Sequence, residues 1–180
     1  PDTRIDDDAV LTKLHTFMAQ DPAVGIAAPR LRYMDGRIQE TCRRFPKWYT
    51  PIHQRLPFLS ADGAERHRSW FLMQDFAHDA VMPIDWAQGS ALMVDGGLFR
   101  ELGGFDERFW MYYEDVDLCR RVWERGRSVY YLPQVELFHA YGKESAKMKN
   151  LLHGLVANQK TRTHIMSWIK YTLKWFGKRI

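Results

Sequence analysis

The sequence predicts an α/β fold, because segments with helical periodicity alternate along it with short apolar runs typical of strands. The chain has 180 residues, of which 46% are hydrophobic and 27% are charged, and this is enough to bury the core of one domain. No apolar run approaches the roughly 18 to 20 residues of a membrane span. The sequence contains neither a GxGxxG nor a P-loop pattern, the usual phosphate-binding turns of α/β nucleotide domains.

The first predicted elements are a helix, a buried strand and a hairpin. Acids at 6–8 precede a helix whose apolar residues recur at helical spacing, and Pro22 ends it. The apolar run "VGIAAP", residues 24–29, predicts a buried strand. Asp35 and Gly36 lie between residues of alternating polarity, which predicts a hairpin turn.

The middle of the chain has weaker periodicity. Over about 43–82 no regular pattern persists and three prolines interrupt the stretch, so we predict an irregular segment. Long segments of this kind are usually functional or mobile. Strand character resumes in "PIDWAQGSALMVD". A short helix is predicted in "DGGLFRELGG", with Asp95 as its cap and Gly103 and Gly104 at its end.

The last third of the chain predicts helices around a pair of strands. A helix is expected from Glu114 to Arg125, with Gly126 as its stop. Its inward-facing residues are Leu118, Cys119, Val122 and Trp123. "SVYYLP" and "VELFHA" predict two strands, and from about Glu144 the chain is expected to be helical to Phe176, with a break near 158–163.

Charge and cysteine content narrow the class of protein only partly. The net charge of +4 suits anionic partners such as sugar nucleotides, lipid diphosphates, membrane surfaces or nucleic acid, and selects none of them. Cys42 and Cys119 show no CxxC spacing, so we expect two buried thiols in a reducing compartment rather than a disulfide or a zinc site. The chain begins with Pro1 rather than Met, and we expect it to be truncated.

Three acids follow five bulky side chains in "FWMYYEDVD". Glu114, Asp115 and Asp117 can be explained as acids in the first turn of a helix, where the dipole favours them by roughly 0.3 to 1 kcal/mol each. Asp117 can also pair with Arg121, four residues later. The alternative is an acid held beside an aromatic pocket, where rings suit the apolar face of a sugar and a carboxylate accepts a hydroxyl proton.

Other residues of chemical interest each have a structural interpretation as well. His139 ends a predicted strand and is either structural or a metal ligand that needs a carboxylate partner, for which Asp2 is the candidate. Trp86 fits a core, but Gly89 and Ser90 after it would let a backbone approach a ligand closely. The remaining histidines show no ligand spacing and are interpreted as structural.

Two groups of basic residues also allow two interpretations. Arg43 and Arg44 are either a solvated pair or a clamp for a diphosphate. The tail "WIKYTLKWFGKRI", residues 168–180, is a basic amphipathic helix. It either packs on the protein with its lysine stems or makes a peripheral contact with a membrane surface.

Taken together, these segments resemble glycosyltransferase family 2, in particular its bacterial rhamnosyltransferase-like branch. The matching segments are "PDT", "VGIAAPRLRYMDGRIQETCRRFP", "DWAQGSALMVDGGLFRELGGFDERFWMYYEDVDLCRRVWERG", "HAYGKES" and "SWIKYTLKWFGK". The resemblance implies a GT-A, Rossmann-like fold whose N-terminal nucleotide-binding half is missing from this chain. Residues 1–142 would be the C-terminal part of the catalytic domain, and 143–180 a C-terminal helical extension.

The resemblance also implies an activity: inverting transfer of a sugar, with rhamnose as one candidate, from a nucleotide-diphosphate donor. The acceptor would be a glycan or a polyprenyl-diphosphate-linked glycan, used in cell-surface polysaccharide synthesis. Asp115, with Glu114 beside it, corresponds to the family's catalytic "ED" acids. Asp2 and His139 correspond to residues at the divalent metal, Mg²⁺ or Mn²⁺, and at the diphosphate.

The implied substrate pocket involves Trp86, Gly89 and Ser90, which match the segment that lines the donor and acceptor site. Trp110 and its aromatic neighbours would shape the acceptor pocket and exclude water, and Arg44 would contact the diphosphate. We expect a cytoplasmic protein, at the inner face of the plasma membrane if 168–180 contacts lipid, and no nucleic-acid partner. This chain alone is expected to be inactive. The alternative function is a non-catalytic basic module that binds a membrane surface or nucleic acid.

Overall fold

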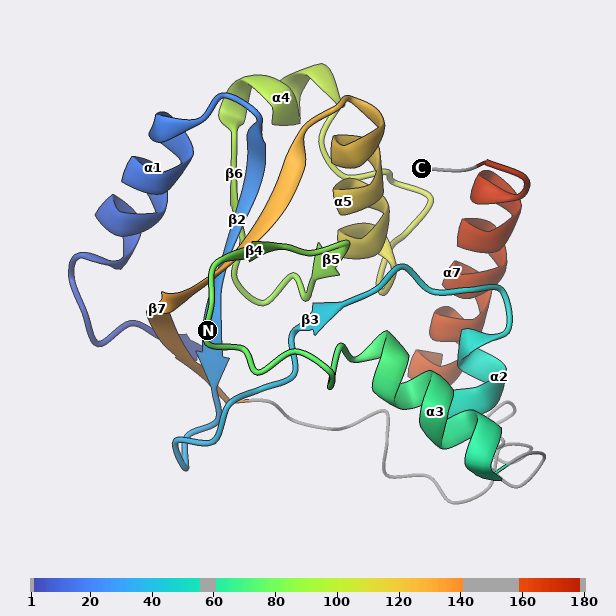
Figure 1. Ribbon diagram of the computed structural model, residues 1–180. Coiled ribbons are helices and arrows are strands. Elements are labelled where there is room, and N and C mark those ends of the chain that lie inside the picture. Colours follow the sequence, from blue (N-terminus) through green and yellow to red (C-terminus); the bar gives the residue numbers. More distant parts are fainter. Residues whose placement is uncertain (1, 56–60, 141–158, 179–180) are drawn as a thin grey trace.

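Within residues 2–55, 61–140 and 159–178, which the computed structural model describes, five strands form a mixed sheet (Figure 1). The strand order is β1–β7–β2–β6, and β4 pairs with β7 as well. The long strands β2 (Val24–Arg32) and β7 (Ser128–His139) run parallel, and the short strands are antiparallel to their neighbours. The short strands are β1 (Thr3–Arg4), β4 (Met82–Pro83) and β6 (Met93–Val94). The predicted α/β class is confirmed.

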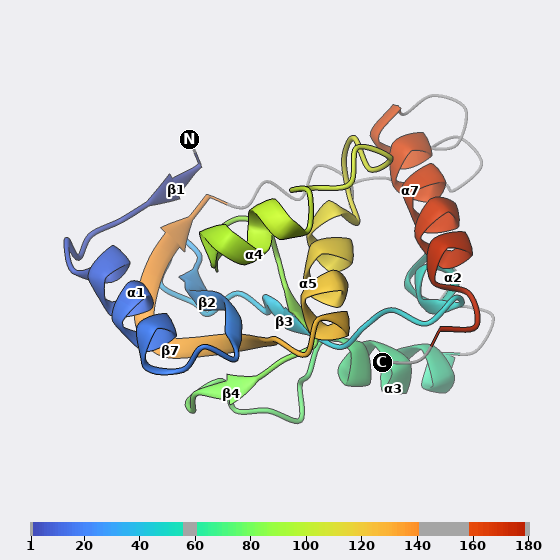
Figure 2. The same cartoon turned by 90° about the horizontal axis from the view of Figure 1, so that it is seen from above.

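Helices cover both faces of this sheet (Figures 1 and 2). Helix α1 (Val10–Gln20) packs on one face with Ala27 and Leu31 of β2, and α5 (Glu114–Glu124) packs on the other with Ile26 and Ala28. Alternate residues of β2 therefore enter different core clusters, as the pleat of a strand requires. A strand buried on both faces reads as a continuous apolar run, which is why "VGIAAP" predicts it correctly.

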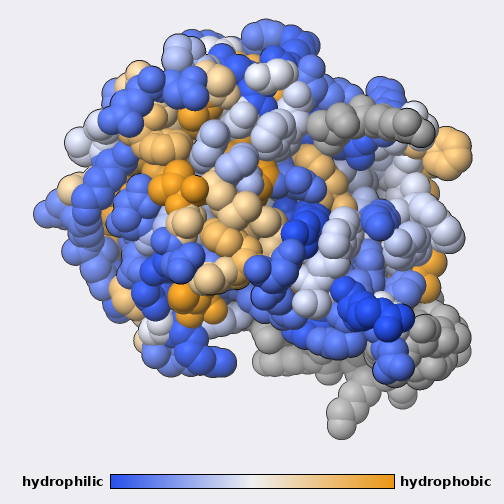
Figure 3. Space-filling view, in the orientation of Figure 1, coloured by the Kyte–Doolittle hydropathy of each residue, from blue (hydrophilic) through white to orange (hydrophobic). Residues whose placement is uncertain are grey.

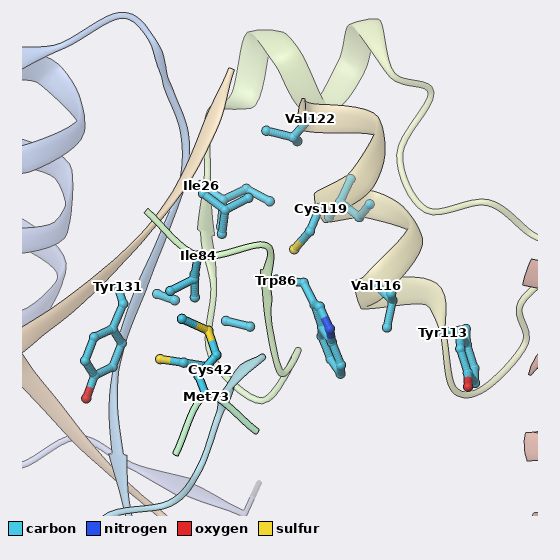
Figure 4. Close-up of a cluster of buried hydrophobic side chains, with 14 of the residues drawn as sticks. Ile26, Cys42, Met73, Ile84, Trp86, Tyr113, Val116, Cys119, Val122 and Tyr131 are labelled. Atoms are coloured by element: carbon cyan, nitrogen blue, oxygen red, sulfur yellow. The ribbon is translucent and has the colours of Figure 1, made fainter. Parts of the chain in front are cut away.

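The larger core cluster lies on the α5 side of the sheet and is drawn in Figure 4. It includes both cysteines, which are free and fully buried, and burial raises the pKa of each thiol to about 12. Trp86, Val116 and Tyr113 lie at the end of the cluster remote from Tyr131 (Figure 4). The prediction of two buried, unlinked thiols is confirmed.

The prediction of an irregular segment over about 43–82 is wrong in part, because two helices lie within it. These are α2 (Thr50–Arg55) and α3 (Ala61–Phe71). The buried residues of α3 have helical spacing, but they include Ala64 and His67, so the apolar periodicity is weak in sequence. Thr50 Oγ1 and His67 Nε2, 2.8 Å apart and buried, tie the two helices together.

Strands β3 (Cys42–Arg43) and β5 (Trp86–Ala87) pair with each other and form a second, two-stranded sheet. Helix α4 (Gly96–Glu101) is capped as predicted, because Asp95 Oδ1 accepts the Leu98 N–H at 2.6 Å. The two glycines after it have φ of +75° and +74°, in the left-handed region that ends helices.

The segment predicted as two strands near the end of the sheet is one strand, β7. Its pairing with β2 shifts register between Leu132 and Glu136, opposite Pro29 and Arg30. Pro133 lies within this shift, where its missing N–H does not interrupt a regular ladder. The predicted turn at Asp35–Gly36 forms, with φ of +86° at the glycine, but the returning strand is reduced to a single bridge between Arg32 and Ile38.

Helix α7 (Gln159–Trp175) packs alongside α5 on the side away from the sheet (Figure 2). Its buried residues include Tyr171 and Trp175, which join the larger core cluster. The helix predicted here is confirmed over 159–175, but the break expected near 158–163 is wrong for 159–163, which belong to α7. Gly142 and Ser145 of "HAYGKES", the start of the predicted helix and residues 179–180 lie outside the described residues. In the described ranges, no helix has the length and apolar character to cross a membrane.

Candidate active site

A cavity of about 540 Å³ lies where the N-terminus of α5, the segment after β5 and one side of α7 meet. Glu114 and Asp115 line it from α5, and Trp86, Gly89 and Ser90 line it from β5 and the segment after it. The structure therefore brings together five of the predicted site residues, which come from two parts of the chain.

The carboxylate of Asp115 is held by two main-chain amides. Its Oδ2 accepts the N–H of Gly89 at 2.9 Å, and its Oδ1 accepts the N–H of Val116 at 2.8 Å. A Cβ atom on Gly89 would lie only 3.2 Å from the Cβ of Asp115. The close approach of these two segments therefore depends on glycine at position 89.

Burial has the largest effect on the acidity of Asp115 and raises its pKa. The two amide hydrogen bonds and the positive charge of Arg43 oppose this effect without cancelling it. A carboxylate with a raised pKa is a stronger base than an ordinary aspartate. Asp115 is consequently more basic than its place in the first turn of a helix alone would make it.

Glu114 also lines the cavity, but its surroundings differ from those of Asp115. Burial and, second, the negative charge of Asp115 raise the pKa of Glu114 to about 7. Its Oε2 atom is buried and accepts no hydrogen bond within the described part of the chain. Two adjacent carboxylates in one cavity thus differ in how their charge is stabilised, an arrangement found at many acid–base sites.

The backbone before α5 is strained. Tyr112 and Tyr113 have φ of +68° and +69°, and Tyr113 is the N-cap of α5 without a side-chain capping bond. Left-handed backbone at a residue other than glycine costs roughly 1 to 3 kcal/mol and is concentrated at functional sites. Helix α7 supports this turn, because Ser167 Oγ donates to the Met111 carbonyl at 2.8 Å and the His164 ring contacts both tyrosine rings.

Basic side chains face the same cavity: Arg43 from β3, and Lys160 and His164 from α7. The guanidinium of Arg43 lies over the rings of Trp86 and Phe71, 5.4 and 5.6 Å from their centroids. Sequence reasoning missed Lys160 and His164, since no local pattern links them to the acids of α5. Their only signal is their place on an amphipathic helix.

Two predicted substrate residues lie away from this cavity. Arg44 donates to both oxygens of Asp75, at 3.1 and 2.8 Å, and to the Trp70 carbonyl. Trp110 is 74% exposed and is not among the lining residues. The arginine that lines the cavity is Arg43, the last residue of β3, whereas Arg44 lies one residue beyond that strand and is held by Asp75 and Trp70. Substrate roles for Arg44 and Trp110 stay predictions.

The two predicted metal ligands are neighbours. Strand β1 pairs with the end of β7, and this brings Asp2 Oδ2 to 3.5 Å from His139 Nε2. Gln39 accepts at Oε1 from His139 Nδ1 at 3.0 Å while its amide donates to the carbonyl of the same histidine. In the neutral ring, this contact places the proton on Nδ1 and leaves the lone pair of Nε2 on the side of Asp2.

This pair fits part of a divalent metal site, since an imidazole nitrogen and a carboxylate are both accepted ligands of Mn²⁺. The Thr3 hydroxyl donates to the carbonyl of Ser90 at 3.4 Å, which places the pair close to the cavity. Among the residues that the structure describes, no group of three or more His, Cys, Asp or Glu side chains could hold a metal ion. Further ligands would have to come from a substrate, water or residues beyond the described set.

Asp117 faces away from the cavity, into the contact between α5 and α7. It is fully buried, and its Oδ2 accepts from Arg121 Nε at 2.8 Å, as predicted. It also accepts from Lys174 Nζ and from Trp175 Nε1. The carboxylate therefore anchors α7 against α5, a role that the predicted pairing with Arg121 did not include.

No family model matches the chain. The N-acetylglucosaminyl-diphospho-decaprenol L-rhamnosyltransferases of two Mycobacterium tuberculosis strains are 32% identical over 126 residues, which are 66% of this chain and 38% of each relative. The rhamnosyltransferase WbbL of Escherichia coli K12 is 38% identical over 56 residues, 31% of this chain and 21% of the relative. The low-salt glycan biosynthesis hexosyltransferase Agl10 of Haloferax volcanii is 32% identical over 59 residues, 33% of this chain and 19% of the relative. The matched segment thus spans less than two fifths of the mycobacterial relatives.

Proposed function

We propose that this chain is a rhamnosyltransferase-like member of glycosyltransferase family 2 and takes part in inverting glycosyl transfer. The ground is its similarity to named rhamnosyltransferases and other glycosyltransferases. The observation that carries the proposal is the Asp115 carboxylate, held at the cavity by the amides of Gly89 and Val116. The donor would be a nucleotide-diphosphate sugar. The reaction would be a single displacement at its anomeric carbon.

In this reaction Asp115 is the general base. It takes the proton of an acceptor hydroxyl as that oxygen attacks the anomeric carbon, and the bond to the nucleotide diphosphate breaks on the opposite side. Each Asp115 oxygen uses one lone pair for an amide and keeps another for the hydroxyl proton. The raised pKa of this carboxyl favours the transfer, and general-base help of this kind is typically worth about 10² to 10⁴ in rate.

Asp2 and His139 would hold the divalent ion, Mg²⁺ or Mn²⁺, beside the leaving diphosphate. When bound, such an ion offsets the negative charge that develops on the leaving group. What supports this assignment is the approach of the two side chains to each other and to Ser90 at the cavity. Gln39, by binding His139 Nδ1, would keep Nε2 available as a ligand.

The acceptor is proposed to be a lipid-linked glycan. The names of the mycobacterial relatives specify an N-acetylglucosaminyl-diphospho-decaprenol acceptor and transfer of L-rhamnose. For this chain, a diphosphate in the acceptor would suit the basic wall of Arg43, Lys160 and His164. The aromatic rings at the cavity would pack against sugar faces and exclude water that would hydrolyse the donor.

The alternative, a non-catalytic basic module, has less support. Lys174 in the basic tail is paired with Asp106 and Asp117, and Lys170 donates to the carbonyl of Arg108. The charge of Lys174 is thus used in packing within the protein, whereas Lys170 makes its contact while it stays exposed. A cytoplasmic location stays an expectation from the proposed donor class.

The proposal is tested by Asp115→Asn in the full-length protein, with transfer of rhamnose from its nucleotide diphosphate to a synthetic N-acetylglucosaminyl-diphospho-polyprenol. We expect turnover to fall by about 10² to 10⁴ with near-normal donor binding, because the amide keeps the shape of the carboxylate but cannot take a proton. The matched control is Asp8→Asn, at an exposed aspartate before α1, which should keep full activity. Turnover retained by Asp115→Asn would overturn the assignment.

A further inference from the structure

The outward face of α7 is an apolar stripe. Met166, Ile169 and Leu173 of α7 are 51%, 39% and 72% exposed, and Phe176, in the turn directly after the helix, is 82% exposed. Their spacing of three and four residues places them on one side of the helix. Figure 3 shows apolar atoms at the right-hand edge of the molecule, over α7, next to hydrophilic side chains. Here we call these four residues the outer stripe.

The outer stripe cannot turn inward, because the opposite side of α7 is held by specific contacts. Ser167 Oγ donates to the Met111 carbonyl at 2.8 Å, Trp168 Nε1 to the Trp48 carbonyl at 3.0 Å, and Trp175 Nε1 to Asp117 at 2.9 Å. These bonds fix the rotation of the helix about its axis. Its apolar residues therefore divide into a buried set and an outward set.

The charged residues of this segment are of one sign. Residues 159–178 contain five Lys or Arg residues and no Asp or Glu. Arg162, Lys170 and Lys178 are exposed, whereas Lys174 is turned inward to Asp106 and Asp117. A cationic helix with one apolar face matches an anionic lipid surface, where the apolar side chains enter the headgroup boundary and the basic groups meet phosphates. A second copy of the same helix would bring like charges together.

We propose that the outer stripe binds the surface of an anionic bilayer, with α7 lying in the plane of the interface. The same helix lines the cavity with Lys160 and His164. Membrane binding through its outer side would hold that cavity wall beside the lipid headgroups. The binding itself needs neither donor nor acceptor, so it goes beyond the proposed activity and can be tested separately from it.

The test is sedimentation of the protein with vesicles, without any substrate. Vesicles of phosphatidylglycerol mixed with phosphatidylcholine are compared with vesicles of phosphatidylcholine alone. We expect the unmodified chain to bind the anionic vesicles at least about tenfold more tightly, and binding to weaken as salt is raised. Equal binding to the two kinds of vesicle, or none to either, would overturn the proposal.

Two variants test whether vesicle binding depends on the outer stripe or on exposed apolar side chains in general. Leu173→Ser combined with Phe176→Ser should reduce anionic-vesicle binding by about tenfold or more. The control is Leu11→Ser on α1, where the leucine is 60% exposed, and it should bind as the unmodified chain does. Unchanged melting temperatures show that all variants fold. Unchanged vesicle binding by the double variant would exclude the stripe as the membrane contact.

A second copy of the chain is the other conceivable occupant, and analytical ultracentrifugation distinguishes it. We expect a monomer at micromolar concentration in the absence of vesicles. A dimer that the double variant abolishes would assign the outer stripe to self-association instead and overturn the membrane proposal.

Discussion

The main-chain N–H of Gly89 donates a hydrogen bond to Oδ2 of Asp115 over 2.9 Å. This bond joins the segment after β5 to the first turn of α5. A donor from the main chain has no rotamers of its own, so it holds the carboxylate in one orientation. The proposed base is therefore positioned by the backbone of a second segment and by its own helix.

Gly89→Ala should impair catalysis more than stability. An added Cβ would meet the Asp115 Cβ at 3.2 Å, closer than ordinary contact, and a displacement of about 1 Å can cost roughly 10²-fold in rate. We expect kcat for glycosyl transfer to fall by about ten- to a hundredfold. The measurement is steady-state kinetics of the full-length protein together with its melting temperature.

The matched control for this change is Gly96→Ala in α4. The nearest atom to an added Cβ there is the flexible end of Arg100, at 3.6 Å. That variant should keep its activity. Wild-type kcat in Gly89→Ala would show that the close approach does not position Asp115.

Glu114 should make stability depend on pH. Its pKa rises from 4.5 to about 7 on folding, because burial and then the charge of Asp115 disfavour the carboxylate. The folded state thus keeps a proton that the unfolded chain loses, and the stabilisation is fully present below pH 4.5 and is lost as pH rises through about 7. We expect a loss of ~1–2 kcal/mol, allowing for partial solvent screening.

Glu114→Gln removes this titration, so the difference between variant and unmodified protein isolates it. Urea unfolding between pH 4 and 8 should show the free energy of unfolding falling more steeply with pH when Glu114 is present. Parallel curves for the two proteins would mean that Glu114 titrates normally.

Lys160→Gln should weaken acceptor recognition. If the basic wall binds the acceptor diphosphate, loss of one charged hydrogen-bond donor should raise the acceptor KM by about ten- to a hundredfold, with little change in the donor KM. Kinetics at varied acceptor and fixed donor measure this. Lys13→Gln on α1, whose ammonium pairs with Asp7, is the control. A change confined to the donor KM would place the acceptor diphosphate elsewhere.

Asp117→Asn should destabilise the attachment of α7. The buried carboxylate pairs with Arg121 and Lys174 and accepts from Trp175, so its loss leaves Arg121 without its carboxylate partner and Lys174 with Asp106 alone. We expect about 3 to 5 kcal/mol of destabilisation, against roughly 1.5 to 3 kcal/mol for Trp175→Phe, which removes one hydrogen bond to the carboxylate. Equilibrium urea unfolding checks both, and near-native stability of Asp117→Asn would contradict the anchoring role.

The sequence predicted correctly those elements that carry a strong local signal, such as an apolar run, a capping residue or a terminal glycine. The apolar run of β2, the Asp95 cap of α4 and the stop of α5 at Gly126 all form as expected. The failures have local causes too. Helix α3 was missed because a histidine and an alanine occupy its buried side, and β7 was divided in two because a proline lies at its register shift.

By itself, the sequence determined the α/β class, the resemblance to glycosyltransferase family 2 and the acids at the start of α5. Those features depend on residues that are neighbours in the chain. Only the tertiary structure decided that Arg43 rather than Arg44 lines the cavity and that Asp117 anchors α7. It also decided that α7 contributes Lys160 and His164 to the site. The reason is physical: the place where a strand ends and the rotation of a helix set which way each side chain points, and both are determined by packing against segments far away in sequence.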